Sequence, residues 1–105
     1  MKTNDNKNYN ELADKILIQE GLFDEVKKET AKYYKYQNKM NISKINEIYD
    51  KYLSKVYKKT FKEWMELYIS KSDSKRLSEL EIYMNEIKDI KKYFEDVDKY
   101  DNLWR

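Results

Sequence analysis

The sequence predicts an all-α protein, an antiparallel bundle of three long helices whose first helix is kinked or split near Gly21, with a four-helix bundle as the variant. Three observations predict this class. The 105 residues include one Gly and no Pro, the residues that most often interrupt helices. No Asn-Gly, Asp-Gly or Gly-Gly pair is present to form a tight β-hairpin turn. Apolar side chains recur at spacings of three and four, as in an amphipathic helix.

The length is that of one domain, so we expect residues 1–105 to form a single helical bundle. The polar start of the chain predicts a disordered N-terminus over about residues 1–8. A short helical stripe follows, stops before Gly21 and resumes weakly after it, which predicts one bent helix or two short ones. The apolar positions are Tyr9, Leu12, Ala13, Ile16 and Leu17, then Leu22, Phe23, Val26, Ala31, Tyr33, Tyr34 and Met40.

The clearest helix is predicted over about residues 41–69, where the apolar positions form one stripe. We interpret its aromatic members as core or boundary residues, because aromatic side chains bury large areas. The chain has eleven tyrosines, more than so small a core needs, so some are expected at the surface. The stripe consists of Ile42, Ile45, Tyr49, Tyr52, Leu53, Val56, Tyr57, Phe61, Trp64, Met65 and Tyr68.

A second long helix is predicted over about residues 74–101. The polar stretch 70–74 suits a turn and a helix N-cap. Apolar side chains then recur every seven residues, which is a heptad-like seam and predicts lengthwise packing at a crossing angle of about 20°. One row contains Leu80, Ile87 and Phe94, and the other contains Tyr83, Ile90, Val97 and Trp104.

The composition excludes most catalytic chemistry. Without Cys or His the chain has no Ser-His-Asp triad, thiolate nucleophile, imidazole proton shuttle or ordinary zinc site. Carboxylates three residues apart, such as Glu63 and Glu66, lack the companion His of a di-metal Glu-x-x-His motif. We therefore expect a protein that is not an enzyme and has no catalytic residue, no metal and no cofactor.

Three further features bear on location. The absence of cysteine fits a reducing compartment, and the polar N-terminus is not followed by the apolar segment of a secretion signal. No apolar run approaches the ~20 residues that a membrane span needs. The expectation is a cytoplasmic protein with no membrane partner.

The charge is unevenly distributed along the chain. The formal net charge is +2, but residues 27–62 hold eleven basic and three acidic side chains, a net charge of +8. On the predicted helix 41–69, five lysines fall on the side opposite the apolar stripe and extend over roughly 27 Å at 1.5 Å per residue. This lysine ridge consists of Lys44, Lys51, Lys55, Lys58 and Lys62.

The lysine ridge has two interpretations. It could contact several phosphates of a nucleic acid, with single-stranded bases stacking on Tyr33, Tyr34 and Tyr36. Alternatively, it is the solvated outer face of a bundle helix, which can also bind protein. The acidic C-terminal third either ion-pairs with the basic block or presents a phosphate-like array to a nucleic-acid-binding protein.

These patterns predict a non-catalytic helical protein–protein interaction module, in which exposed tyrosines supply contact area and charged faces orient the encounter. Small charged helical proteins without catalytic groups are common among phage and mobile-element accessory proteins. We therefore expect an inhibitor of a host defence nuclease, as anti-CRISPR proteins are, whose partner is a nuclease or ribonucleoprotein. The alternative is an RNA or single-stranded nucleic-acid-binding module that uses the lysine ridge. A homo-oligomer formed through the heptad seam is the third class.

Overall fold

The computed structural model describes the backbone of residues 8–34, 39–71 and 73–103 and, of these, the side chains of residues 8–34, 42–71 and 73–97. Within these ranges the chain forms four packed α-helices and no strand, which confirms the all-α prediction and has the helix count of the variant. The sequence predicts disorder for about residues 1–8, and residues 1–7 of this segment lie outside the described ranges. Tyr36 and Trp104 lie outside them too.

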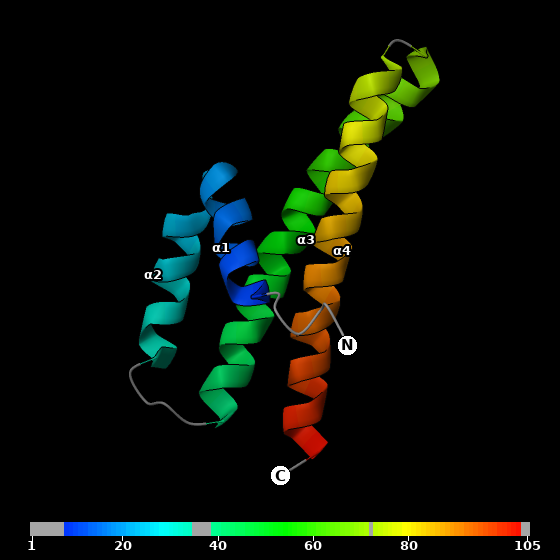
Figure 1. Cartoon of the computed structure of the whole chain (residues 1–105). Helices are drawn as coiled ribbons and strands as arrows, with labels where there is room; N and C mark the ends of the chain where they lie inside the picture. The colour runs from blue at the N-terminus through cyan, green and yellow to red at the C-terminus, as the bar shows by residue number, and fades with distance from the viewer. Residues whose placement is uncertain (1–7, 35–38, 72, 104–105) are drawn as a thin grey trace.

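The four helices follow the predicted segments closely. The two long helices begin and end within about two residues of the predicted bounds. Figure 1 shows them side by side and antiparallel, as a hairpin. The helices are α1 (Tyr9–Gln19), α2 (Phe23–Tyr34), α3 (Lys39–Ser70) and α4 (Ser74–Leu103).

The chain splits into α1 and α2 at Gly21, as the sequence predicts. Gly21 has a φ of 74°, in the left-handed region that favours glycine. Its N–H donates to the Ile18 carbonyl at 3.1 Å, and the Leu22 N–H donates to the Leu17 carbonyl at 2.8 Å. These two bonds form a Schellman motif, which satisfies the last carbonyls of α1 and ends the helix.

The turn between α3 and α4 also has an identifiable cause. Lys71 has a φ of 53°, so the chain turns left-handed immediately after α3. The Asp73 carboxylate then accepts a hydrogen bond from the Arg76 N–H at 3.1 Å, which caps the start of α4. The predicted turn and N-cap at residues 70–74 therefore agree with the structure in the residues it describes.

The helices form two layers. α1 and α2 lie side by side against the α3–α4 hairpin, near the half of the hairpin that holds the start of α3 (Figure 1). α1 contacts all three other helices, and α2 contacts α1 and α3. The buried core lies where the layers meet and is built from Ala13, Ile16, Leu17, Val26, Tyr52, Leu53, Val56, Ile87, Ile90 and Phe94.

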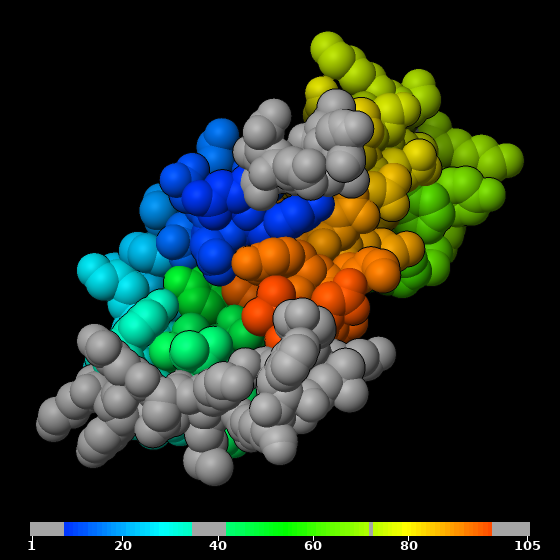
Figure 2. Space-filling view, turned by 60° about the horizontal axis from the view of Figure 1, so that its bottom comes forward, coloured from blue at the N-terminus to red at the C-terminus, as the bar shows by residue number. Residues whose placement is uncertain are grey.

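The other half of the α3–α4 hairpin projects beyond the α1–α2 layer (Figure 1). The radius of gyration is 15.7 Å, against about 13 Å for a compact domain of this length. We call this projecting part, residues 61–82, the distal hairpin. Figure 2 shows its yellow-green tip standing clear of the blue and cyan α1–α2 layer. It has two helices where the rest of the fold has four, so it has fewer neighbours to cover its apolar side chains.

Candidate protein-docking surface

A row of three aromatic rings, two exposed and the central one half-buried, runs along α3 in the distal hairpin. Phe61, Trp64 and Tyr68 are spaced by three and four residues and therefore lie on one face of the helix. Their rings stack in sequence, with centroids 5.9 Å apart between Phe61 and Trp64 and 5.1 Å apart between Trp64 and Tyr68. Phe61 is 41% exposed and Tyr68 is 59% exposed. We call these three residues the aromatic strip.

A groove lies beside the aromatic strip, between α3 and α4. It has a volume of about 300 Å³ and is open to solvent. The Trp64 indole Nε1 donates a hydrogen bond across it to Glu81 Oε2 at 3.0 Å, which fixes the ring at the groove wall. Its lining residues are Tyr57, Phe61, Trp64, Glu81, Met84 and Asn85.

The groove opens away from α1. Lys59 reaches Glu20, the residue at the end of α1, with an Nζ–Oε1 distance of 3.0 Å, so this side of α3 faces α1. Phe61 is two residues further along and therefore about 160° around the helix from Lys59. The aromatic strip and its groove thus occupy a side of the hairpin that α1 does not cover.

The distal hairpin holds most of the exposed large apolar side chains of the described residues. The sequence interprets the aromatic members of the α3 stripe, Phe61 and Tyr68 among them, as core or boundary residues. That interpretation is wrong for these two, which are exposed because they lie on the side of α3 that α1 does not cover. Eight large apolar side chains are exposed in the described part of the chain, and five of them are in the distal hairpin: Phe61, Met65, Tyr68, Ile69 and Ile82.

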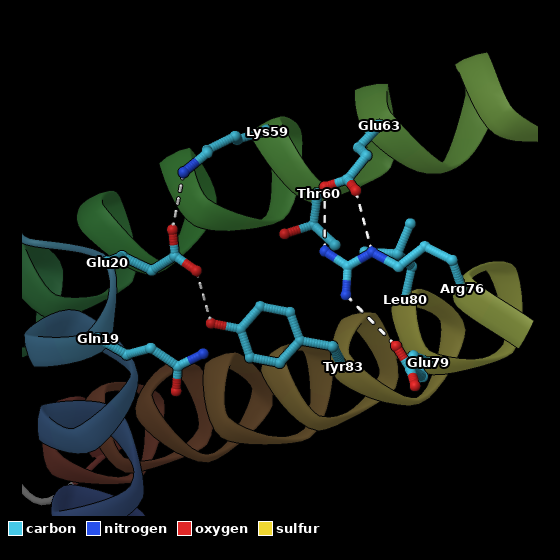
Figure 3. A pocket seen from close by; sticks show the side chains of 9 residues that line it. All are labelled: Gln19, Glu20, Lys59, Thr60, Glu63, Arg76, Glu79, Leu80 and Tyr83. Carbon is cyan, nitrogen blue, oxygen red and sulfur yellow. Dashed lines mark hydrogen bonds and ion pairs between the residues drawn. The ribbon is translucent and has the colours of Figure 1, made fainter.

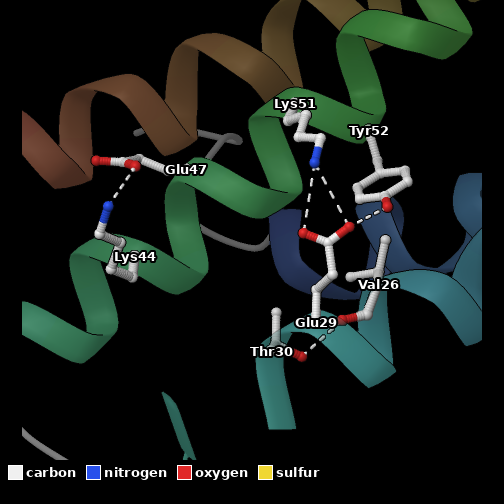
Figure 4. Close-up of polar contacts among 7 residues, drawn as sticks. All are labelled: Val26, Glu29, Thr30, Lys44, Glu47, Lys51 and Tyr52. Carbon is white, nitrogen blue, oxygen red and sulfur yellow. Dashed lines mark hydrogen bonds and ion pairs between the residues drawn. The ribbon is translucent and has the colours of Figure 1, made fainter. Parts of the chain in front are cut away.

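Three of the five lysines in the predicted lysine ridge already interact within the chain. Lys44 pairs with Glu47 at 3.5 Å, one turn along the same helix. Lys51 pairs with Glu29 of α2 at 3.4 Å (Figure 4). The Lys55 Nζ lies 4.8 Å from the centroid of the Tyr52 ring, a cation–π contact.

The remaining two lysines, Lys58 and Lys62, are exposed and have no ion pair among the described residues. Of the tyrosines predicted to stack on bases, Tyr33 is half-buried, with Lys32 Nζ 5.2 Å from its ring centroid. Tyr34 is 54% exposed. The described lysines of the basic block pair with carboxylates of α2 and α3 and at the end of α1, and not with the acidic C-terminal third. The one ion pair between the described parts of the two segments has its acid in the basic block: Asp50 pairs with Lys91 of α4 at 3.3 Å.

Lys51 belongs to a contact that fastens α2 to α3. Glu29 accepts hydrogen bonds from the Tyr52 hydroxyl and from Lys51 Nζ (Figure 4). The Tyr52 hydrogen bond, helped by the nearby Lys51 and Lys55 charges, lowers the pKa of Glu29. The same hydrogen bond, followed by burial, raises the pKa of Tyr52 to about 12. Lys51 therefore has a structural role in this fold.

The nucleic-acid interpretation can now be tested on the two lysines without a structural partner. We expect the unaltered chain to bind an oligonucleotide only at the nonspecific level of about 10⁻⁴–10⁻⁶ M, because most of the ridge charge is engaged. The double variant Lys58→Glu with Lys62→Glu should stay at that level. Fluorescence anisotropy with a labelled single-stranded RNA at 50 and 200 mM salt measures this. Tighter binding by the unaltered chain that the double variant loses would instead establish the ridge as a nucleic-acid site. Lys51→Glu is a poor probe, since it would set a second carboxylate against Glu29.

A polar cleft of about 170 Å³ lies between the end of α1 and the α3–α4 hairpin (Figure 3). Glu20 accepts from the Tyr83 hydroxyl at 2.9 Å and pairs with Lys59. Arg76 donates to Glu63 through Nε at 3.0 Å and contacts Glu79 at 3.5 Å. Three carboxylates meet two cations there, so every cation is paired and the cleft has a net charge of −1. The contacts of Glu20 join the end of α1 to both helices of the hairpin.

Neither a cluster of metal-binding side chains nor a membrane-spanning helix occurs among the described residues. No three Asp or Glu side chains among them lie close enough together to hold a metal ion. None of the helices, over the residues searched, combines the length and the apolar character that crossing a membrane requires.

No protein family, curated protein or solved structure matches this chain when it is compared with known proteins. Its function is therefore inferred from its own residues. Two features remain after the paired charges are accounted for: the exposed aromatic strip with its groove, and the two lysines Lys58 and Lys62. The first is the larger and the more organised.

Proposed function

We propose that this chain is a non-catalytic protein–protein interaction module that binds its partner through the aromatic strip and groove of the distal hairpin. The observation that carries this proposal is the stacked row of Phe61, Trp64 and Tyr68 on a projecting two-helix hairpin, in which Phe61 and Tyr68 are exposed and Trp64 is half-buried. Tyr, Trp, Phe and Met are the side chains enriched in interface cores, and contiguous exposed apolar surface marks binding sites.

The geometry of the strip favours binding. Its rings hold one another in place by stacking, and the hydrogen bond from Trp64 to Glu81 fixes the central ring. Rigid rings lose little conformational entropy when a partner covers them, so more of the contact energy appears as affinity. Central aromatic residues of this kind are typical hot spots.

The charge of the distal hairpin also fits a protein partner better than a nucleic acid. Residues 61–82 contain four basic and five acidic side chains, a net charge of −1. A phosphate backbone gains nothing from such a surface, whereas an apolar protein surface meets no electrostatic penalty. The binding should therefore depend weakly on salt.

The proposal predicts that binding follows the aromatic strip. A protein captured by the immobilised chain from nuclease-treated lysate of its host is identified, purified and titrated against the chain by calorimetry. We expect Phe61→Ala with Tyr68→Ala to weaken its affinity at least tenfold, because interface hot spots contribute about 2 kcal/mol or more each. Ile82→Ala is the matched control, since Ile82 is 70% exposed on the other helix of the same hairpin. Equal loss in the control, or no loss in the double variant, would refute this docking surface.

Inhibition of a host defence nuclease is the narrower role that the composition predicts, and it stays a prediction. If the purified partner is a nuclease, its cleavage rate with and without the chain measures inhibition directly. The Phe61→Ala and Tyr68→Ala double variant then distinguishes inhibition through the strip from inhibition through another surface.

A further inference from the structure

We infer that the distal hairpin pairs with the distal hairpin of a second copy of this chain, with Tyr68 of each copy seated in the groove of the other. This inference rests on the proposed function, because it names the partner of the same surface. It differs from the homo-oligomer that the sequence predicts, which would form through the heptad seam, because Leu80, Ile87, Ile90 and Phe94 of that seam are buried within the chain.

The groove and the most exposed ring of the strip follow one another along α3. The groove wall is centred on Phe61, and the most exposed ring of the strip, Tyr68, lies seven residues further along. At 1.5 Å per residue the two are roughly 10 Å apart along the helix axis. A two-fold axis midway between them, close to Trp64, brings Tyr68 of each copy over Phe61 of the other. The groove lies on one side of this axis and the Tyr68 ring on the other, so the surface is self-complementary. A two-fold interface requires such a surface.

The groove is large enough to hold an aromatic ring. The groove has a volume of about 300 Å³ and opens to solvent. A cavity of about 150 Å³ holds a benzene ring, so this groove has room for the Tyr68 ring of a second copy. Met84 lines its floor at 8% exposure, and methionine adapts well to an entering aromatic ring.

The net charge of the distal hairpin also favours contact between two copies. Two copies that meet through residues 61–82 each bring a net charge of −1, so they meet almost no net repulsion. Two copies that met through residues 27–62 would each bring a net charge of +8. A second copy can therefore approach the distal hairpin more easily than the basic segment 27–62.

The exposed area sets the expected strength. A large aromatic side chain has about 200 Å² of surface. Multiplied by the exposed fractions, Phe61 and Tyr68 together with Met65 and Trp64 expose roughly 300 Å² of mostly apolar surface. A standard interface buries about 800 Å² per partner, a little over half of it apolar. The strip offers somewhat less apolar surface than the smallest interfaces of that class. We therefore expect a dimer that exchanges with monomer as the concentration changes.

Sedimentation equilibrium over a hundredfold range of concentration tests the pairing. The unaltered chain should shift from monomer to dimer mass, and Tyr68→Glu should stay monomeric, because its carboxylate would enter a groove that already holds Glu81. Ile82→Glu is the matched control, since it places the same charge on an exposed apolar position outside the groove lining. It should dimerise as the unaltered chain does. Circular dichroism confirms that each variant keeps its helices.

A rescue experiment tests the register. Asn85 is exposed and lines the groove, so Asn85→Lys places a cation where Tyr68→Glu of the other copy would arrive. We expect the Tyr68→Glu chain to recover dimer mass when mixed with the Asn85→Lys chain. A monomeric unaltered chain over the whole range, a Tyr68→Glu chain that still dimerises, or a mixture without rescue would each overturn the inferred pairing.

The outcomes separate this inference from the proposed function. An unaltered chain that stays monomeric but binds a different protein through Phe61 and Tyr68 would overturn only the second-copy inference. A surface that binds neither a second copy nor any other protein would overturn both. Dimerisation through the strip supports both.

Discussion

Phe94→Ala should remove a large part of the stability of this fold. Phe94 is 2% exposed, and its ring stacks on Tyr49 of α3 with centroids 5.2 Å apart. It also meets Tyr93 edge to face, with centroids 5.3 Å apart. The Tyr49 hydroxyl donates to Asp14 of α1 at 2.8 Å, so Phe94 supports a contact chain that joins three helices. A buried Phe→Ala change costs about 3–5 kcal/mol, and domains of this size are stable by about 5–15 kcal/mol.

Thermal unfolding followed by circular dichroism measures this effect. A loss of about 3 kcal/mol lowers the Tm of a domain of this size by roughly 12–24 °C. Phe61→Ala is the control, because Phe61 is 41% exposed and lies outside the core. We expect its Tm to fall far less. Similar Tm losses in the two variants would show that the distal hairpin, and not the four-helix region, determines the stability.

The secondary structure could be predicted because local rules decide it. The near absence of Gly and Pro leaves Gly21 as the strongest interruption in the first third, and the chain turns there. The heptad rows of α4 predicted its buried face, since Leu80, Ile87, Ile90 and Phe94 are all buried. Helix periods and turn chemistry act over a few residues, and a single sequence displays them directly.

The aromatic strip could not be placed from periodicity alone. A stripe of apolar residues shows which side of α3 is apolar, but it does not show how far a neighbouring layer extends along it. A signal was present in the lengths. α1 and α2 have 11 and 12 residues, and α3 has 32, so at 1.5 Å per residue the short helices cover roughly 16–18 Å of a helix about 48 Å long. Part of α3 therefore has to extend beyond both short helices.

The lysine ridge shows the opposite case. Charge spacing placed its five lysines on one side of α3 but could not tell which of them are engaged. Lys51 pairs with Glu29, which lies 22 residues earlier in the chain. Only the way α2 packs against α3 brings these two side chains together. Pairings of this kind depend on tertiary structure. The sequence therefore suggested ion pairs with the C-terminal third, whereas the lysines pair with Glu20, Glu29 and Glu47.

Three tyrosines that join helices should make the fold unusually sensitive to alkaline pH. The hydrogen bond to Glu29, followed by burial, raises the pKa of Tyr52 to about 12. Burial, followed by hydrogen bonding to Asp14, raises the pKa of Tyr49, and burial, followed by hydrogen bonding to Glu20, raises the pKa of Tyr83. The three acceptor carboxylates lie on α1 (Asp14), on α2 (Glu29) and at the end of α1 (Glu20). Each tyrosine hydroxyl donates a hydrogen bond to one of them, so it must keep its proton for the contact to persist.

The sign of the effect follows from proton linkage. An unfolded tyrosine releases its proton near pH 10, whereas the folded chain holds it to higher pH. Above pH 10 the folded state binds more protons than the unfolded state, so the free energy of unfolding falls as pH rises. The contribution is fully present below pH 10 and is lost as pH rises through the folded pKa. For the well-buried Tyr52 the loss is about 1.4 kcal/mol per pH unit up to about pH 12. Tyr49 and Tyr83 act in the same direction, because burial and a carboxylate partner raise the pKa of each.

Urea unfolding at a series of pH values between about 8 and 12 measures this loss, with the slope against pH as the quantity compared. We expect Tyr52→Phe to be less stable than the unaltered chain near pH 8, because it lacks the hydrogen bond to Glu29, and to show a shallower slope above pH 10. Tyr68→Phe is the matched control, since Tyr68 is 59% exposed, and its slope should equal that of the unaltered chain. Parallel slopes for Tyr52→Phe and the unaltered chain would contradict the linkage, because removing an ionisable group that titrates differently in the two states must change the slope.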